Sequence, residues 1–255
     1  MKPETTRPVR RLDRSQDASP LYRQLYRELL SLVETLKPGD RLPSERELIE
    51  MYQVSRITVH QALRDLSQTN QIVRVQGRGT FVSHPKVERR QPFLNSFTED
   101  MRLKGHVPSS RLLRRAELEP APDVQERLAL EDGARTLYLE RLMLADGQPI
   151  ALHYTHLVLA LCTNADEWFS SAALEGSIYA ILEQRCGHEL REAEETVEAA
   201  VAGPAEAKQR DVPAGAPLLW IRRVTCLADG TPIENSTMLY RSDRYRLVMR
   251  SARTG

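Results

Sequence analysis

The sequence is poor in the features that mark membrane, secreted or metal-dependent proteins. It has no run of about 18 apolar residues, which disfavours a membrane-spanning helix. Its first residues are polar and lack the apolar stretch of a secretory signal. The three cysteines, Cys162, Cys186 and Cys226, are scattered and odd in number, so thiols in a reducing cytoplasm fit them better than a disulfide framework or a metal site. We expect a cytoplasmic protein with no metal and no cofactor.

The common motifs of catalysis are missing too. The sequence contains no GxSxG nucleophile elbow, no HExxH metal motif and no glycine-rich phosphate loop. We therefore do not expect an enzyme.

Charge is the first property that indicates a partner. The net charge is only +1, but residues 1–90 hold 17 Lys and Arg against 11 Asp and Glu. The remainder holds 19 basic against 24 acidic residues. A basic first third followed by an acidic remainder is typical of a chain whose first domain binds nucleic acid.

Helical signals follow a flexible basic arm, which we expect over residues 1–18. Apolar residues recur at helical spacing over 21–36 and predict an amphipathic helix, which the segment 37–40 (KPGD) ends. Ser44 and Glu47 form the S-x-x-E pattern that caps a second helix. A third helix has its apolar residues at i, i+3, i+4 and i+7, namely Val59, Ala62, Leu63 and Leu66.

Two short β runs, 72–76 and 80–82, come next and are joined through glycines that permit a tight turn. Helix, helix, tight turn, helix and β-hairpin in this order predict a winged helix-turn-helix over residues 19–83. In such a domain the third helix enters the major groove, where the fork of Arg56 can bind O6 and N7 of a guanine. We expect Arg78, at the hairpin tip, to enter the minor groove. The predicted DNA contacts are Arg41, Ser44, Arg46, Arg56, Ile57, Thr58, His60, Gly77 and Arg78.

The rest of the chain changes character after an expected exposed linker over 84–93. Residues 94–250 read as a second domain of strands and short helices. Strands are predicted over 136–144, 150–159, 218–227 and 233–240, and a helix over 177–185. LADGQPI at 144–150 nearly repeats as LADGTPI at 227–233. The repeat indicates a duplicated strand–turn–strand unit in one antiparallel sheet, or convergence of two good hairpin turns.

The first domain contains five motifs in a specific order: LPSEREL at 42–48, VSR at 54–56, TV at 58–59, QAL at 61–63 and GRGTFV at 77–82. Through these motifs it resembles the DNA-binding domain of GntR-family regulators over roughly residues 20–83. The resemblance implies Arg46, Arg56 and Gly77 as DNA contacts. His60 stands where many members carry a second arginine.

The second domain contains the short stretches SFTEDM at 96–101, PIA at 149–151, SIY at 177–179, PIE at 232–234 and DRY at 243–245. Through them the chain from about Leu94 onward resembles the ligand-binding UTRA domain of the HutC-like branch. That resemblance implies an α+β protein, in which the winged helix-turn-helix precedes an antiparallel sheet with flanking helices, similar in architecture to chorismate lyase. It also implies a homodimer, which favours a palindromic operator in double-stranded DNA.

The effector contacts are implied by resemblance to relatives that bind phosphosugars, whose ligand-binding positions are matched here. Two positions depart from them: Met143 replaces a second arginine and His153 replaces an acidic residue. We expect a small polar or anionic effector. For His153 a partly buried strand histidine is an equally good interpretation, and for Tyr240 a packing role is at least as good. The implied effector contacts are Ser96, Phe97, Arg141, His153, Ser177, Tyr179, Glu234 and Tyr240.

These observations favour a repressor that leaves its operator when a small molecule binds the second domain. Two alternatives remain open. The first is an enzyme, which only the lyase-like fold suggests. A fold by itself does not establish a catalytic activity. A DNA-bound architectural protein would have no effector.

Overall fold

The computed structural model describes residues 11–15, 17–75, 77–84, 86–90, 94–204, 207, 212 and 214–251. The chain divides into two compact units, Met1–Pro85 and Lys86–Gly255.

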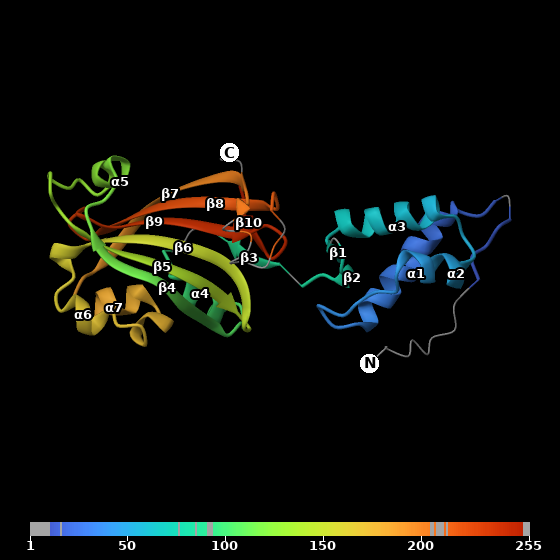
Figure 1. The fold of residues 1–255 in the computed structure, drawn as a ribbon, viewed down its shortest axis with the longest axis horizontal. Coiled ribbons are helices and arrows are strands. Elements are labelled where there is room, and N and C mark those ends of the chain that lie inside the picture. The colour runs from blue at the N-terminus through green and yellow to red at the C-terminus, as the bar shows by residue number, and fades with distance from the viewer. Residues whose placement is uncertain are drawn as a thin grey trace. The chain divides into compact units, whose positions relative to one another are not determined.

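The first unit is the expected winged helix-turn-helix (Figure 1). The apolar stripes of its three helices meet in one core, which includes Leu25, Leu29, Val59 and Leu63 at 0% exposure. Its elements are α1 (Leu21–Thr35), α2 (Glu45–Tyr52), α3 (Arg56–Gln68), β1 (Ile72–Val75) and β2 (Gly79–Val82).

Serine caps fix where α2 and α3 begin. Ser44 accepts a hydrogen bond from the backbone of Glu47, whose carboxylate accepts one in return, so the predicted capping box is confirmed. Ser55 caps α3 by accepting from the backbone of Thr58 at 3.1 Å. Between the helices Gln53 adopts a left-handed conformation, with φ of 53°, which makes the turn tight.

The arm is not wholly free of the domain. Residues 1–10 lie outside the described part of the chain. Leu12 packs against the core, and the backbone of Asp13 both donates to and accepts from the side chain of Gln24 at 2.8 Å. The prediction of flexibility is therefore wrong for these residues, because a leucine and a bidentate amide fasten them to α1.

The predicted linker needs a similar correction. Strand β3 (Val87–Arg90) lies inside the second unit and pairs in parallel with β10 (Tyr245–Val248). Val87 and Arg89 are 4% and 6% exposed. The charge of this segment suggested exposure, but two of its residues alternate inward as a strand requires. Pro85 and residues 91–93 lie outside the described residues.

A six-stranded antiparallel sheet in the order β4-β5-β6-β9-β8-β7 dominates the second unit (Figure 1). The two repeated hairpins are β5–β6 and β8–β9, and they meet along β6 and β9. The strand order is symmetric about that junction, so the sequence repeat corresponds to a structural repeat of three strands. The strands are β4 (Pro108–Leu118), β5 (Thr136–Ala145), β6 (Gln148–Val158), β7 (Leu190–Val201), β8 (Pro217–Leu227) and β9 (Pro232–Arg241).

Helices α4 and α7 lie along one face of this sheet (Figure 1). Packing against that face forms two apolar clusters, one with α4, β3 and β10 and the other with α7. The helices and turns of this unit are α4 (Phe97–Leu103), α5 (Pro122–Arg127), η1 (Leu159–Leu161), α6 (Ala165–Trp168), η2 (Ala173–Glu175) and α7 (Ile178–Gln184).

Within the described ranges, no helix is long and apolar enough to cross a membrane. The three cysteines are free thiols, and Cys162 is buried.

Candidate nucleic-acid interface and ligand cavity

The start of α3 presents a polar face with one exposed apolar side chain. Arg56 has 83% of its side chain exposed, and Ile57 is 81% exposed. His60 is exposed one turn further along, whereas Thr58 is half-buried with its hydroxyl 2.9 Å from that of Ser55. An isoleucine this exposed is suited to an apolar contact such as a thymine methyl.

Ion pairs hold this face together. Glu45 of α2 lies 2.6 Å from Arg74 of β1 and 3.9 Å from Arg56. Arg74 is also 3.4 Å from the ring of His60. Arg46 pairs with Glu50 at 3.0 Å on an exposed surface of α2. Arg74 was missed by the sequence analysis because it lies in a strand, away from the helix that carries the other contacts.

The tip of the wing forms a second basic group. Gly77 has a φ of 72°, and Arg78 beside it is exposed. Arg41 pairs with Phe81 along β2, and its guanidinium lies close enough to Gly79 that an added Cβ would be 3.0 Å from Nε. The structure thus distributes the nine predicted contacts over the start of α2, the start of α3 and the wing.

The second unit holds a cavity between its two apolar clusters. All eight predicted effector residues line it, as does Met143. Its free volume is about 30 Å³, which is room for one or two water molecules. Side chains fill most of the site, so a larger ligand must displace some of them.

Arg141 of β5 is a buried cation in this cavity, only 5% exposed. One of its terminal nitrogens makes long hydrogen bonds of 3.4 Å to the carbonyls of Leu174 and Gly176. Its Nε has no hydrogen-bond partner among the described residues. Burial lowers its pKa to about 10, against an opposing effect of the Glu234 charge, so the group stays charged at neutral pH. A buried guanidinium with this little pairing is suited to bind an anion.

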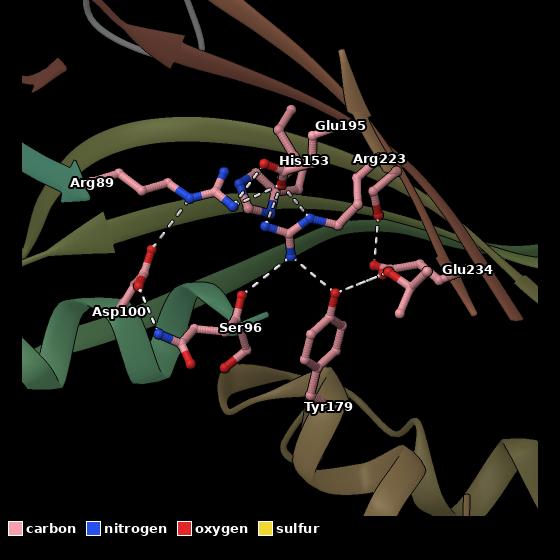
Figure 2. A network of polar contacts seen from close by, with 12 residues as sticks. Arg89, Ser96, Asp100, His153, Tyr179, Glu195, Arg223 and Glu234 are labelled. Carbon is pink, nitrogen blue, oxygen red and sulfur yellow. Dashed lines mark hydrogen bonds and ion pairs between the residues drawn. The ribbon is translucent and has the colours of Figure 1, made fainter. Parts of the chain in front are cut away.

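Arg223 is the counterpart of Arg141 on β8, and it is fully paired (Figure 2). It binds Glu195 of β7 through Nε at 2.6 Å and a terminal nitrogen at 2.5 Å. It also donates to the Tyr179 hydroxyl at 2.9 Å. Arg89 of β3 binds the same Glu195 at 2.8 Å, so one carboxylate bridges two guanidinium groups.

Glu234 is satisfied by hydroxyl groups. It accepts hydrogen bonds from Thr225 at 2.6 Å, Ser236 at 2.6 Å and Tyr179 at 3.1 Å. Burial raises the pKa of Tyr179, so the phenol stays protonated and acts as a donor. One wall of the cavity therefore consists of the Glu234 carboxylate and the three neutral hydroxyl groups that donate to it.

His153 is neutral in this setting. Burial and the charge of Arg141 lower its pKa well below the usual value. One ring nitrogen is 3.2 Å from the Tyr240 hydroxyl, and the ring meets Phe97 edge to face at a centroid distance of 5.8 Å. The position for which the resemblance implied an acidic residue therefore holds an uncharged aromatic ring.

The two predicted serines have local roles as well. Ser96 caps α4 and Ser177 caps α7, each by accepting a backbone hydrogen bond at 3.2 Å. Because both helices line the cavity, these caps place the serines at its wall.

Sequence reasoning missed Arg223, Arg89 and Glu195. The repeat itself carried the signal for Arg223, because it aligns this residue with Arg141 after a slip of one residue. Arg89 was hidden by the interpretation of its segment as a linker. Glu195 lies in β7, a strand that the alternation pattern did not reveal.

Comparison with known proteins agrees with both halves of this description. Residues 21–82 match the family described as bacterial regulatory proteins, gntR family, and residues 103–246 match the UTRA domain. The HTH-type transcriptional repressor NagR of Bacillus subtilis is 34% identical, over 91% of this chain and 95% of that protein. The histidine utilization repressor of Pseudomonas putida is 27% identical, over 90% and 91%.

A solved structure has the same fold. The crystal structure of PhnF from Mycobacterium smegmatis aligns with a TM-score of 0.63 and 28% identity, covering 90% of this chain and 99% of that one.

Proposed function

Because the chain belongs to the GntR family of bacterial regulatory proteins and carries a UTRA domain, we propose that it is a repressor that a small anionic effector releases from a palindromic operator. The family establishes a DNA-binding transcription regulator rather than an enzyme. The operator symmetry, the homodimer and the release by effector are the parts that we propose.

DNA recognition rests on the exposed face of α3. Arg56 reads a guanine in the major groove, and Ile57 contacts a thymine methyl. Arg78 at the wing tip enters the minor groove, where the negative potential favours a guanidinium.

The remaining predicted contacts flank these two grooves. Arg46 and His60 lie beside the major groove that α3 enters. Ser44 and Arg41 bind backbone phosphates, and Gly77 lets the wing backbone approach them.

A homodimer supplies the second half-site. One winged helix-turn-helix contacts too few base pairs to select a single genomic site. Two copies related by a two-fold axis read inverted repeats, which is the arrangement that a palindrome offers.

The effector binds in the cavity, and the observation that carries this proposal is the buried, under-paired guanidinium of Arg141. An anionic group of the effector supplies the missing partner. Tyr179, Glu234 and Ser177 bind its polar groups, while His153, Tyr240 and Phe97 form an uncharged aromatic wall. Ser96 lies at the same wall. Release follows if the effector prefers the arrangement that cannot bind DNA.

The DNA-binding half is tested with Arg56→Ala in the full chain. Fluorescence anisotropy on the DNA upstream of its own gene should show specific binding lost, with the oligomeric state unchanged. Arg127→Ala, on α5 of the second unit, is the matched control and should bind as the unaltered protein does. Equal operator affinity in both variants would reject the assignment.

A further inference from the structure

Arg89 belongs both to the wall of the ligand cavity and to the first strand after the DNA-binding unit. Only residues 83–86 separate the end of β2 from the start of β3 in the chain. Strand β3 pairs with β10 and not with the six-stranded sheet. A contact that orders β3 therefore also restrains residues 83–86, which connect β3 to the wing.

The ion pairs of Arg89 tie β3 to the cavity (Figure 2). One terminal nitrogen binds Glu195 at 2.8 Å, and Nε lies 3.8 Å from Asp100 of α4. The side chains of Arg89, Glu195 and Arg223 are only 7%, 10% and 8% exposed. Charges attract each other more strongly where water is excluded, and removing one partner of a buried pair leaves the other uncompensated.

Glu195 is the shared member of this bridge. Burial alone would raise the pKa of its carboxyl, but the charge of Arg223 and the hydrogen bond from Arg89 hold it below the usual value. The carboxylate is therefore ionised at neutral pH and neutralises two guanidinium groups at once. It comes from β7, the edge strand of the six-stranded sheet in the part of the chain that the structure describes.

An anion that enters the cavity meets this bridge. The free volume of about 30 Å³ excludes a metabolite unless side chains move. Arg141 and Arg223 both line the cavity and both attract the anion, and at Arg223 the group already in place is Glu195. The incoming anion and Glu195 thus compete for one guanidinium.

We propose that the Arg89–Glu195–Arg223 bridge transmits effector binding to the connection between the two units: an anionic group of the effector displaces Glu195 from Arg223, which breaks the bridge and loosens β3. This inference rests on the proposed function, because it assumes an anionic effector in the cavity. The chemistry of the group is a carboxylate or a phosphate. In the protein without effector the bridge is intact. It keeps β3 ordered, and the protein then binds DNA with high affinity.

Glu195→Gln and Arg89→Gln test the bridge in the full chain without any effector, since each removes one charge with little change in size. Arg222→Gln is the matched control. Arg222 pairs with Glu198 at 2.8 Å between the same two strands, but successive residues of a strand point to opposite faces, so it lies outside the bridge. Glu195→Asp keeps the charge and should restore the behaviour of the unaltered protein in part.

Two readouts are measured, amide hydrogen exchange over β3 and β10, and affinity for the DNA upstream of its own gene. Both bridge variants should exchange at least tenfold faster over residues 87–90 and bind that DNA five- to 150-fold more weakly, the usual range of coupling between two sites. The control should change neither. Unfolding monitored by circular dichroism confirms that each variant is folded.

Unchanged exchange over β3 in folded Glu195→Gln would overturn the proposal. Faster exchange with unchanged DNA affinity would also overturn it, because the strand would then not be coupled to the DNA-binding unit. If the unaltered protein binds no specific DNA, the proposed function is rejected. The hydrogen-exchange rates of residues 87–90 then still test whether the bridge stabilises β3.

Discussion

Arg141 and Arg223 occupy equivalent positions on the first strands of the two hairpins, yet their buried guanidinium groups have opposite surroundings. Arg223 is 2.5 Å from Glu195 and bonds to Tyr179. Arg141 makes two hydrogen bonds of 3.4 Å to carbonyls, and its Nε has no partner in the described part of the chain. The two equivalent positions of the repeat thus place two cations at the cavity: Arg223, which an acidic residue neutralises, and Arg141, which has no ion-pair partner among the described residues.

Replacing these arginines by methionine should have opposite effects on stability. Arg141→Met removes a buried charge that little compensates, so the free energy of unfolding should stay equal or rise by about 1–2 kcal/mol. Arg223→Met leaves a buried carboxylate with one partner fewer and should lower it by about 3 kcal/mol. Urea unfolding at pH 7 measures both. A larger loss for Arg141→Met than for Arg223→Met would contradict the pairing described here.

Acid should destabilise the second unit through His153. Its folded pKa lies below 6.5, the ordinary value that the unfolded chain retains. The unfolded state therefore binds more protons below pH 6.5, and stability is lost as the pH falls from there toward the folded pKa, by at most about 1.4 kcal/mol per pH unit. His153→Gln should flatten this slope in unfolding measurements from pH 7 to 5. The pKa of His156 is also lowered by burial, so some slope should remain. An identical slope in the variant would show that His153 titrates normally.

The two wing glycines should differ in their tolerance of alanine. Both have positive φ, 72° at Gly77 and 118° at Gly79, so each substitution strains the backbone by about 1 kcal/mol or more. Gly77→Ala meets nothing within 4 Å, whereas a Cβ at Gly79 would lie 3.0 Å from Arg41. Gly79→Ala should therefore be the more destabilising in thermal unfolding and should displace a predicted phosphate contact. Equal melting temperatures for the two variants would contradict this difference and would show that the Arg41 side chain moves aside without cost.

Ile57 should affect binding without affecting stability. Because it is 81% exposed, Ile57→Ala should change the free energy of unfolding by less than about 0.5 kcal/mol. Operator affinity should nevertheless fall several-fold, and binding to unrelated DNA should not change, since the lost contact is to a base and not to phosphate. Parallel titrations of both DNAs give the answer. An equal loss on both would place Ile57 outside the base-reading surface.

The sequence predicted the first unit well because its signals are local. The capping box at Ser44, the apolar spacing around Leu63 and the glycines of the wing each specify one element. Of the second unit it predicted the two hairpins and α7, because DG turns and a serine cap are also local signals.

What the sequence did not reveal depends on long-range contacts. In β7 the less exposed residues include Ala193 and Glu195, whereas Val197 and Val201 are exposed, so its alternation carries no clear apolar face. Strand β3 is stabilised by its parallel partner β10, more than 150 residues away in the chain. The bridge of Arg89 and Arg223 through Glu195 requires both strands to be placed, so no local pattern could have predicted it.

The most direct test of the account measures release of the full chain from the DNA upstream of its own gene by a panel of anionic metabolites, with Arg141→Gln beside the unaltered protein. We predict nanomolar binding that one carboxylate or phosphate compound releases, and a variant that binds the DNA equally but is no longer released. Release of Arg141→Gln at the same concentration of that compound would contradict the account, and so would the absence of any specific binding by the unaltered protein.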